Sequence, residues 1–187
     1  REVLSFDNRG IGLSDAPPGP YSVAQMAEDA HSVMKAAGAE RVNVMGISLG
    51  GMIAQRFALD YPDATNSLIL GCTSHGGREA TPPPGDFMTR CQSWAAAEHP
   101  NEAEGDAEWF MRRMLPAAAL EADAADGDRF FEQFKTAFLQ TRRSGTGLQG
   151  QLAAMGRFNS VKRLESIACP VLVVGGEQDA VVPSVNS

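Results

Sequence analysis

The sequence predicts an open, mostly parallel α/β sheet with helices on both faces. Three observations predict this fold class. Apolar runs typical of buried parallel strands occur at residues 42–45, 67–72 and 170–174. Segments with helical spacing of apolar residues precede the first run and separate it from the second. A glycine-containing loop follows each run, as expected where a parallel strand gives way to a crossover.

The first helix is predicted from its two ends. Ser22 and Gln25 have the spacing of a capping box, and Gly38 is suited to the residue after the last turn, so we expect a helix over 22–37. A second helix is expected over 52–61, closed by Pro62. Before them, residues 1–6 are expected to form a short strand that leads into a loop over 7–15.

The middle of the chain departs from this alternation. After a proline-rich linker at 81–85, helices are expected over 86–98, 106–115, 128–142 and 146–157, and the alanine-rich 117–125 is a helix or an exposed linker. We therefore divide the chain into a core, 1–75 and 161–187, and an inserted helical cap, 76–160. Most aromatic residues fall in the cap. We expect some of them to be contacts between small helices and others to line an apolar substrate pocket, for which Trp109 and Phe110 are candidates.

Composition excludes several classes of protein. The chain has 187 residues, a formal net charge of −7 and 21% charged residues, which argues against nucleic acid and anionic membranes as partners. No apolar run is long enough to cross a bilayer. Three widely spaced cysteines suit a reducing compartment, so we expect a cytoplasmic protein. No pattern of metal ligands is present, and we expect neither metal nor cofactor. Oligomeric state is not predicted.

Residues 46–50, Gly-Ile-Ser-Leu-Gly, carry the most specific chemistry. They stand between an apolar strand and a helix, which is the context of a nucleophile elbow. Such a turn strains the serine backbone and presents its hydroxyl to a pocket. We therefore predict Ser48 as a nucleophile, with the N–H of Leu49 as an oxyanion donor.

A serine nucleophile needs a base, and the base needs an orienting carboxylate. Asp179 follows the last apolar run and is the predicted carboxylate, with Glu177 as the alternative. Taken alone, Asp179 is more typical of a turn aspartate that bonds its own backbone, but the Gly-x-Ser-x-Gly pattern upstream favours the catalytic role. His75 follows another strand and is a candidate for the substrate pocket. In this type of site the base follows the carboxylate in the chain, and no histidine follows Asp179. We expect the base beyond residue 187.

Three segments together name a family. The loop 7–15, the elbow 46–52 and the strand with its loop 169–179 match, in order and spacing, the α/β-hydrolase superfamily, which the chain resembles along its whole length. The resemblance implies that the three loops follow the fourth, fifth and seventh strands of that fold. It also implies that the second oxyanion donor lies before residue 1 and the catalytic histidine after residue 187. We therefore expect an internal piece of a longer protein, inactive and poorly stable alone.

Within the superfamily, Ser-Leu-Gly-Gly-Met at the elbow and Thr-Ser-x-Gly-Gly at 73–77 look most like the group of carboxylesterases, enol-lactonases and cofactor-free haloperoxidases. The resemblance implies a serine hydrolase that cleaves a small carboxylic ester or lactone through an acyl-enzyme. Two alternatives remain open: acyl transfer or peroxyacid formation on the same triad, and a ligand-binding pseudo-hydrolase without catalysis.

Overall fold

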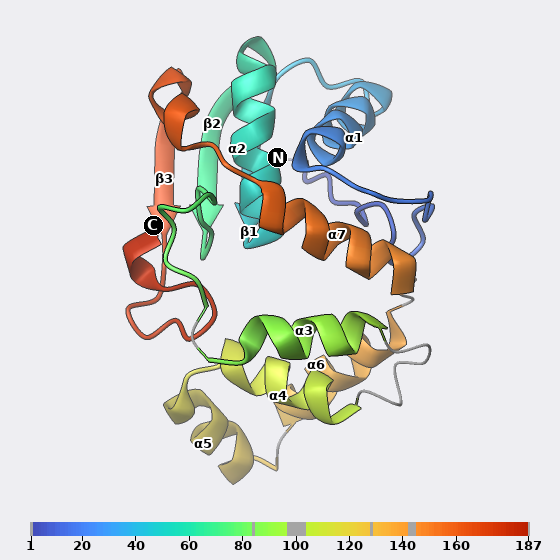
Figure 1. The fold of residues 1–187 in the computed structure, drawn as a ribbon, viewed down its shortest axis with the longest axis vertical. Coiled ribbons are helices and arrows are strands. Elements are labelled where there is room, and N and C mark those ends of the chain that lie inside the picture. The colour runs from blue at the N-terminus through green and yellow to red at the C-terminus, as the bar shows by residue number, and fades with distance from the viewer. Residues whose placement is uncertain (1, 84, 97–103, 128, 142–144, 187) are drawn as a thin grey trace.

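A computed structural model describes residues 2–83, 85–96, 104–127, 129–141 and 145–186. A sheet with its helices forms one part of the molecule, and a layer of short helices forms the other (Figure 1). The arrowheads of the three strands all point toward that second layer, so the carboxyl ends of the strands face it. Parts of the predicted linker and cap helices lie outside the described residues.

The three strands are β1 (Val42–Ile47), β2 (Thr65–Gly71) and β3 (Val171–Val174). They form a parallel sheet in the order β1-β2-β3, in which Met45 pairs with Ile69 and Ile69 with Leu172. The predicted parallel α/β architecture is confirmed. Each strand also starts within a few residues of the apolar run that predicted it.

Two helices cover one face of this sheet. Helix α1 (Val23–Ala36) starts at the predicted capping box, in which the Ser22 hydroxyl and the Gln25 side chain each bond the other's backbone. Helix α2 (Leu49–Asp60) begins three residues earlier than predicted, directly after Ser48. The main core lies between the helices and the strands and includes the following residues: Met26, Ala27, Met34, Met52, Ile53 and Phe57.

Burial of the other sheet face was predicted wrongly for the described residues. Met45 and Ile47 on β1 are 65% and 56% exposed, and all four residues of β3 are exposed. The apolar runs were interpreted as strands covered on both faces, but β1 and β3 are the two edges of the described sheet and helices α1 and α2 occupy a single face. The expected strand at 1–6 is also absent from residues 2–6, because no neighbouring strand pairs with it there.

The second layer holds α3 (Phe87–Ala96), α4 (Glu104–Met114), α5 (Ala117–Ala125) and α6 (Arg129–Gln140). Stacked and tilted rings join α3, α4 and α6; they belong to Phe87, Trp94, Trp109, Phe110, Phe134 and Phe138. The predicted helices are therefore confirmed apart from their ends, and the alanine-rich segment is a helix with no buried residue. We call α3–α6 the helical layer.

Helix α7 (Gly145–Arg157) runs between the helical layer and the core. Its Ala154, together with Phe158 just after it, belongs to the main core cluster, and Gln151 Nε2 donates to the Arg9 carbonyl oxygen at 2.9 Å. Short 3-10 turns at η1 (Pro62–Ala64), η3 (Val161–Ser166) and η4 (Ser184–Asn186) complete the structure. The division into core and cap at residues 76 and 160 stays a prediction. Within the described residues, no helix has the length and apolar character needed to span a membrane.

Candidate active site

The chain passes directly from β1 into α2 at Ser48. Ser48 has φ 53° and ψ −121°, and its side chain makes no capping bond to the helix. Positive φ is costly for a non-glycine residue, by about 1–3 kcal/mol. Gly46 permits the turn, because a Cβ at this position would collide with the Gly50 carbonyl group. A strained serine between a strand and a helix is the geometry that the Gly-x-Ser-x-Gly pattern predicts.

Residues at the end of β2 hold the Ser48 backbone from the side. The Ser48 N–H donates to the Gly71 carbonyl oxygen at 3.0 Å. The Ser48 carbonyl oxygen accepts the Thr73 hydroxyl at 2.7 Å. The strained residue is thus fixed at both its donor and its acceptor by residues on the neighbouring strand end.

Leu49 is the first residue of α2. The first N–H groups of a helix have no partner within it, and the helix dipole makes this end positive. An anion beside Ser48 would therefore meet backbone donors and a favourable field. This is the place at which the sequence predicts an oxyanion donor.

Cys72, between Gly71 and Thr73, connects β2 to the loop that follows it. Its φ is 41°, and its N–H donates to the Val174 carbonyl oxygen at 2.8 Å. Burial raises the pKa of the Cys72 thiol, and a hydrogen bond to Asp179 raises it further, against a lowering by the Gly176 backbone. The Asp179 side chain therefore lies beside the carboxyl ends of β2 and β3.

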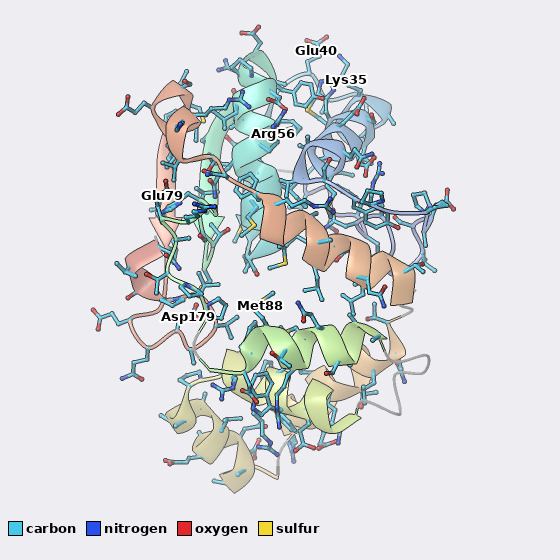
Figure 2. All side chains as sticks on the ribbon, viewed as in Figure 1. Lys35, Glu40, Arg56, Glu79, Met88 and Asp179 are labelled. Atoms are coloured by element: carbon cyan, nitrogen blue, oxygen red, sulfur yellow. The ribbon has the colours of Figure 1, made fainter. Side chains whose placement is uncertain are left out.

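Asp179 lies on the loop after β3, at the end of the sheet nearer to α3 (Figure 2). Its Oδ1 accepts the N–H groups of Val181 and Val182, each at 2.8 Å. Asp179 therefore bonds the backbone of its own turn, as the alternative interpretation predicts, and it also contacts Cys72. Glu177, the second carboxylate candidate, is exposed. Among the residues that the structure describes, no cluster of three His, Cys, Asp or Glu side chains could hold a metal ion.

His75 is half-buried in the loop that follows Thr73. Its Nδ1 lies 2.8 Å from the Gly76 carbonyl oxygen, which accepts only, so Nδ1 is the donor in this contact. Its own carbonyl oxygen accepts the Ser160 N–H at 2.9 Å. His75 is therefore fixed at the carboxyl end of the sheet, as its place in the sequence predicts.

Trp109 and Phe110 lie on α4, within the aromatic contacts of the helical layer. Guanidinium groups of Arg90 and Arg113 lie 4.7 and 4.3 Å from the Trp109 ring centre. Phe110 contacts the rings of Phe87, Trp94 and Phe138. These contacts fit the interpretation as helix–helix packing, and the role in a substrate pocket stays a prediction.

A cleft of about 530 Å³ lies between α3 and α7. It combines apolar side chains with two amides and a guanidinium, and its lining residues are Met88, Gln92, Ala95, Gln149, Leu152, Ala153, Gly156 and Arg157. Sequence reasoning missed this cleft, because apolar periodicity does not tell which face of a small helix meets a neighbouring helix. It also missed Thr73, although the Thr-Ser-x-Gly-Gly pattern marked that loop.

The fold and the elbow together define the class of protein. The chain belongs to the alpha/beta hydrolase fold family, which it matches over residues 1–187.

Relatives agree with this family. A protein described as putative carbamate hydrolase RutD, from Escherichia coli O6:H1, is 30% identical over 204 residues, which cover 100% of this chain and 64% of that protein. The crystal structure of a hydrolase from Pseudomonas aeruginosa PA01 has a TM-score of 0.78 at 30% identity and covers 96% of this chain and 63% of that one. Est816, an N-acyl homoserine lactone degrading enzyme, has a TM-score of 0.70 at 25% identity over 96% of this chain and 66% of its own. The chain thus spans about two thirds of their length.

Proposed function

We propose that the protein containing this chain is a serine hydrolase that cleaves a small carboxylic ester or lactone. The observation that carries the proposal is the strained Ser48, at φ 53° between β1 and the first residue of α2. In the proposed reaction the Ser48 hydroxyl attacks the acyl carbon. A catalytic histidine takes the Ser48 proton, and the carbonyl oxygen becomes an oxyanion beside the Leu49 N–H. Collapse of the oxyanion breaks the ester C–O bond, and the alcohol leaves with that proton. Water, deprotonated by the same histidine, then attacks the acyl-serine and releases the carboxylic acid, and Ser48 regains its proton.

Asp179 is the proposed carboxylate that orients the catalytic histidine. Its position after β3 and its contact with the loop that holds Ser48 support it over the exposed Glu177. In the proposal the histidine comes from beyond residue 187 and the second oxyanion donor from before residue 1. The relatives' greater length is consistent with both.

The substrate is proposed to enter between the helical layer and the carboxyl ends of the strands, with His75, Trp109 and Phe110 as pocket candidates. The names of the relatives support an acyl substrate with a heteroatom leaving group. A carbamate, an ester and a lactone share an acyl carbon that is attacked in the same way.

The test uses the protein encoded by the complete reading frame. We expect a fluorophosphonate to label it covalently, and we expect Ser48→Ala to abolish labelling and to lower ester hydrolysis at least ~10³-fold. Ser67→Ala is the matched control, since Ser67 lies on β2 and bonds Asn43 in the neighbouring strand. Labelling that persists in Ser48→Ala would refute the proposal.

A substrate panel separates the alternatives. Aryl esters, lactones and aryl carbamates are compared, with alcohols and hydrogen peroxide added as competing acceptors. Hydrolysis that dominates in every case supports the proposal. Faster transfer to an alcohol or to peroxide would instead assign acyl transfer or peroxyacid formation, and binding without turnover would assign the pseudo-hydrolase.

A further inference from the structure

We propose that Thr73 is a positioning residue for oxyanion stabilisation, acting on the Leu49 N–H through the carbonyl group of Ser48. The inference rests on the proposed function, because it assigns to Thr73 a role in the same reaction. It starts from the hydrogen bond in which the Thr73 hydroxyl donates to the Ser48 carbonyl oxygen at 2.7 Å.

The Ser48 carbonyl and the Leu49 N–H belong to a single peptide unit. A trans peptide is planar, and its C=O and N–H point in opposite directions. A donor that holds the carbonyl oxygen on one side therefore fixes the N–H on the other side. If this peptide rotated, the proposed oxyanion donor would leave the site while the Ser48 side chain stayed near it.

Three donors converge on the Ser48 carbonyl oxygen. The N–H groups of Gly51 and Met52 lie at 2.9 and 3.2 Å, and the Thr73 hydroxyl lies closest. The first two belong to the opening turn of α2 and move with it. Thr73 belongs to the end of β2, so its bond ties the peptide to a different element, the sheet.

The surroundings of Thr73 favour a rigid contact. Its side chain is 3% exposed. A Cβ placed on Gly51 would lie 2.5 Å from both Cβ and Oγ1 of Thr73, so the glycine permits the close approach. A hydrogen bond shielded from water is stronger than an exposed one, and it polarises the peptide so that the opposite N–H becomes a better donor.

Removal of the Thr73 hydroxyl should affect the reaction step more than substrate binding. We expect Thr73→Val to lower kcat for an ester, and the maximal rate of fluorophosphonate labelling, by about tenfold, which is less than the loss of a complete oxyanion donor. KM should change less than twofold, because the oxyanion forms only in the transition state. Thr73→Ser keeps the hydroxyl and should restore most of the rate.

Thr65→Val is the matched control. Thr65 is 1% exposed and donates its hydroxyl to the Tyr61 carbonyl oxygen at 2.9 Å, which is the same kind of bond at the opposite end of β2 and α2. It should reduce thermal stability about as much as Thr73→Val and leave kcat unchanged. Rates are compared per folded molecule at a temperature well below each unfolding midpoint. If Thr73→Val does not fold, Thr73→Ala takes its place.

The outcomes are separable. The inference is supported if kcat is low in Thr73→Val, recovers in Thr73→Ser and is unchanged in Thr65→Val. The inference is overturned if kcat is unchanged in Thr73→Val, if Thr73→Ser is as slow as Thr73→Val, or if Thr73→Val and Thr65→Val lose kcat equally. Labelling that survives Ser48→Ala would instead refute the proposed function itself.

Discussion

Ser48 and Cys72 both have positive φ values, 53° and 41°, and they occupy the carboxyl ends of neighbouring strands. The Ser48 N–H bonds Gly71, the residue before Cys72, and the Ser48 carbonyl bonds Thr73, the residue after it. The two strained residues therefore support each other's position. Backbone strain of this kind persists only where neighbouring contacts hold the residue in place. Here the ends of β1 and β2 and the start of α2 supply those contacts.

Because Cys72 contacts Asp179, the reactivity of the Cys72 thiol can be used to test the position of the proposed carboxylate. Burial raises the pKa of the Cys72 thiol first, and the Asp179 carboxylate raises it further. Asp179→Asn removes a negative charge, so the pKa should fall and the thiolate fraction at pH 8 should rise. Because the thiolate is the nucleophile, alkylation of Cys72 by iodoacetamide should become about threefold faster or more.

Peptide mapping by mass spectrometry follows Cys72 separately from Cys91 and Cys169 in this experiment. Glu177→Gln is the control, because it removes a charge from the same loop at an exposed position. It should leave the rate unchanged. If Cys72 is alkylated equally fast in Asp179→Asn and in the protein without the substitution, the carboxylate does not act on the thiol.

At the scale of elements, the loop after β2 connects the elbow helix to the end of α7. Ser160 donates its hydroxyl to Gln55 Oε1 at 2.7 Å, and Gln55 Nε2 donates to the Ser74 carbonyl oxygen at 3.1 Å. Gln55 is 2% exposed and Ser160 is also 2% exposed. This buried network joins α2, the loop and the segment that follows α7, near residues 75 and 160 where the core and cap are predicted to meet.

Ser160→Ala should therefore be costly. It leaves the buried Gln55 Oε1 without its donor, and we expect the free energy of unfolding to fall by about 1–3 kcal/mol. Urea denaturation of the protein from the complete reading frame measures the change.

Ser14→Ala removes an exposed hydroxyl that donates to the Asp7 carbonyl oxygen, and it should cost less than about 0.5 kcal/mol. Equal costs for the two alanine variants would contradict a structural role of the buried network.

Sequence reasoning predicted best those features that depend on local chemistry. The side chains of Ser22 and Gln25 start α1 by bonding each other's backbone, and the Gly38 N–H donates to the Lys35 carbonyl oxygen after the last turn. The pattern around Ser48 predicts the strand–turn–helix junction. The prediction that β3 is buried was wrong. An apolar run shows that a strand favours apolar contacts, but it does not show which elements lie beside the strand. Thr73 and the α3–α7 cleft depend on contacts between residues distant in sequence, which spacing does not encode.

At the scale of the whole molecule, an apolar sheet face remains uncovered in the described part of the chain. Met45, Ile47 and Leu172 are each at least 56% exposed, and Met45 and Leu172 both pair with Ile69 in the sheet register. Apolar faces beside open strand edges are typical sites of association. We therefore expect the isolated 187-residue chain to self-associate at micromolar concentration, as sedimentation velocity or light scattering would reveal.

Leu172→Lys should shift the isolated chain toward monomer, because a charge in the middle of β3 opposes pairing of two such faces. The matched control is Leu13→Lys, which alters a leucine that is 88% exposed in the loop at 7–15 and belongs to no strand. It adds the same charge and should leave association unchanged. Equal effects of the two lysines would attribute association to net charge, and a monomeric isolated chain would mean that the exposed face is too small to drive it. The longer protein should stay monomeric at this face if its additional residues cover the sheet.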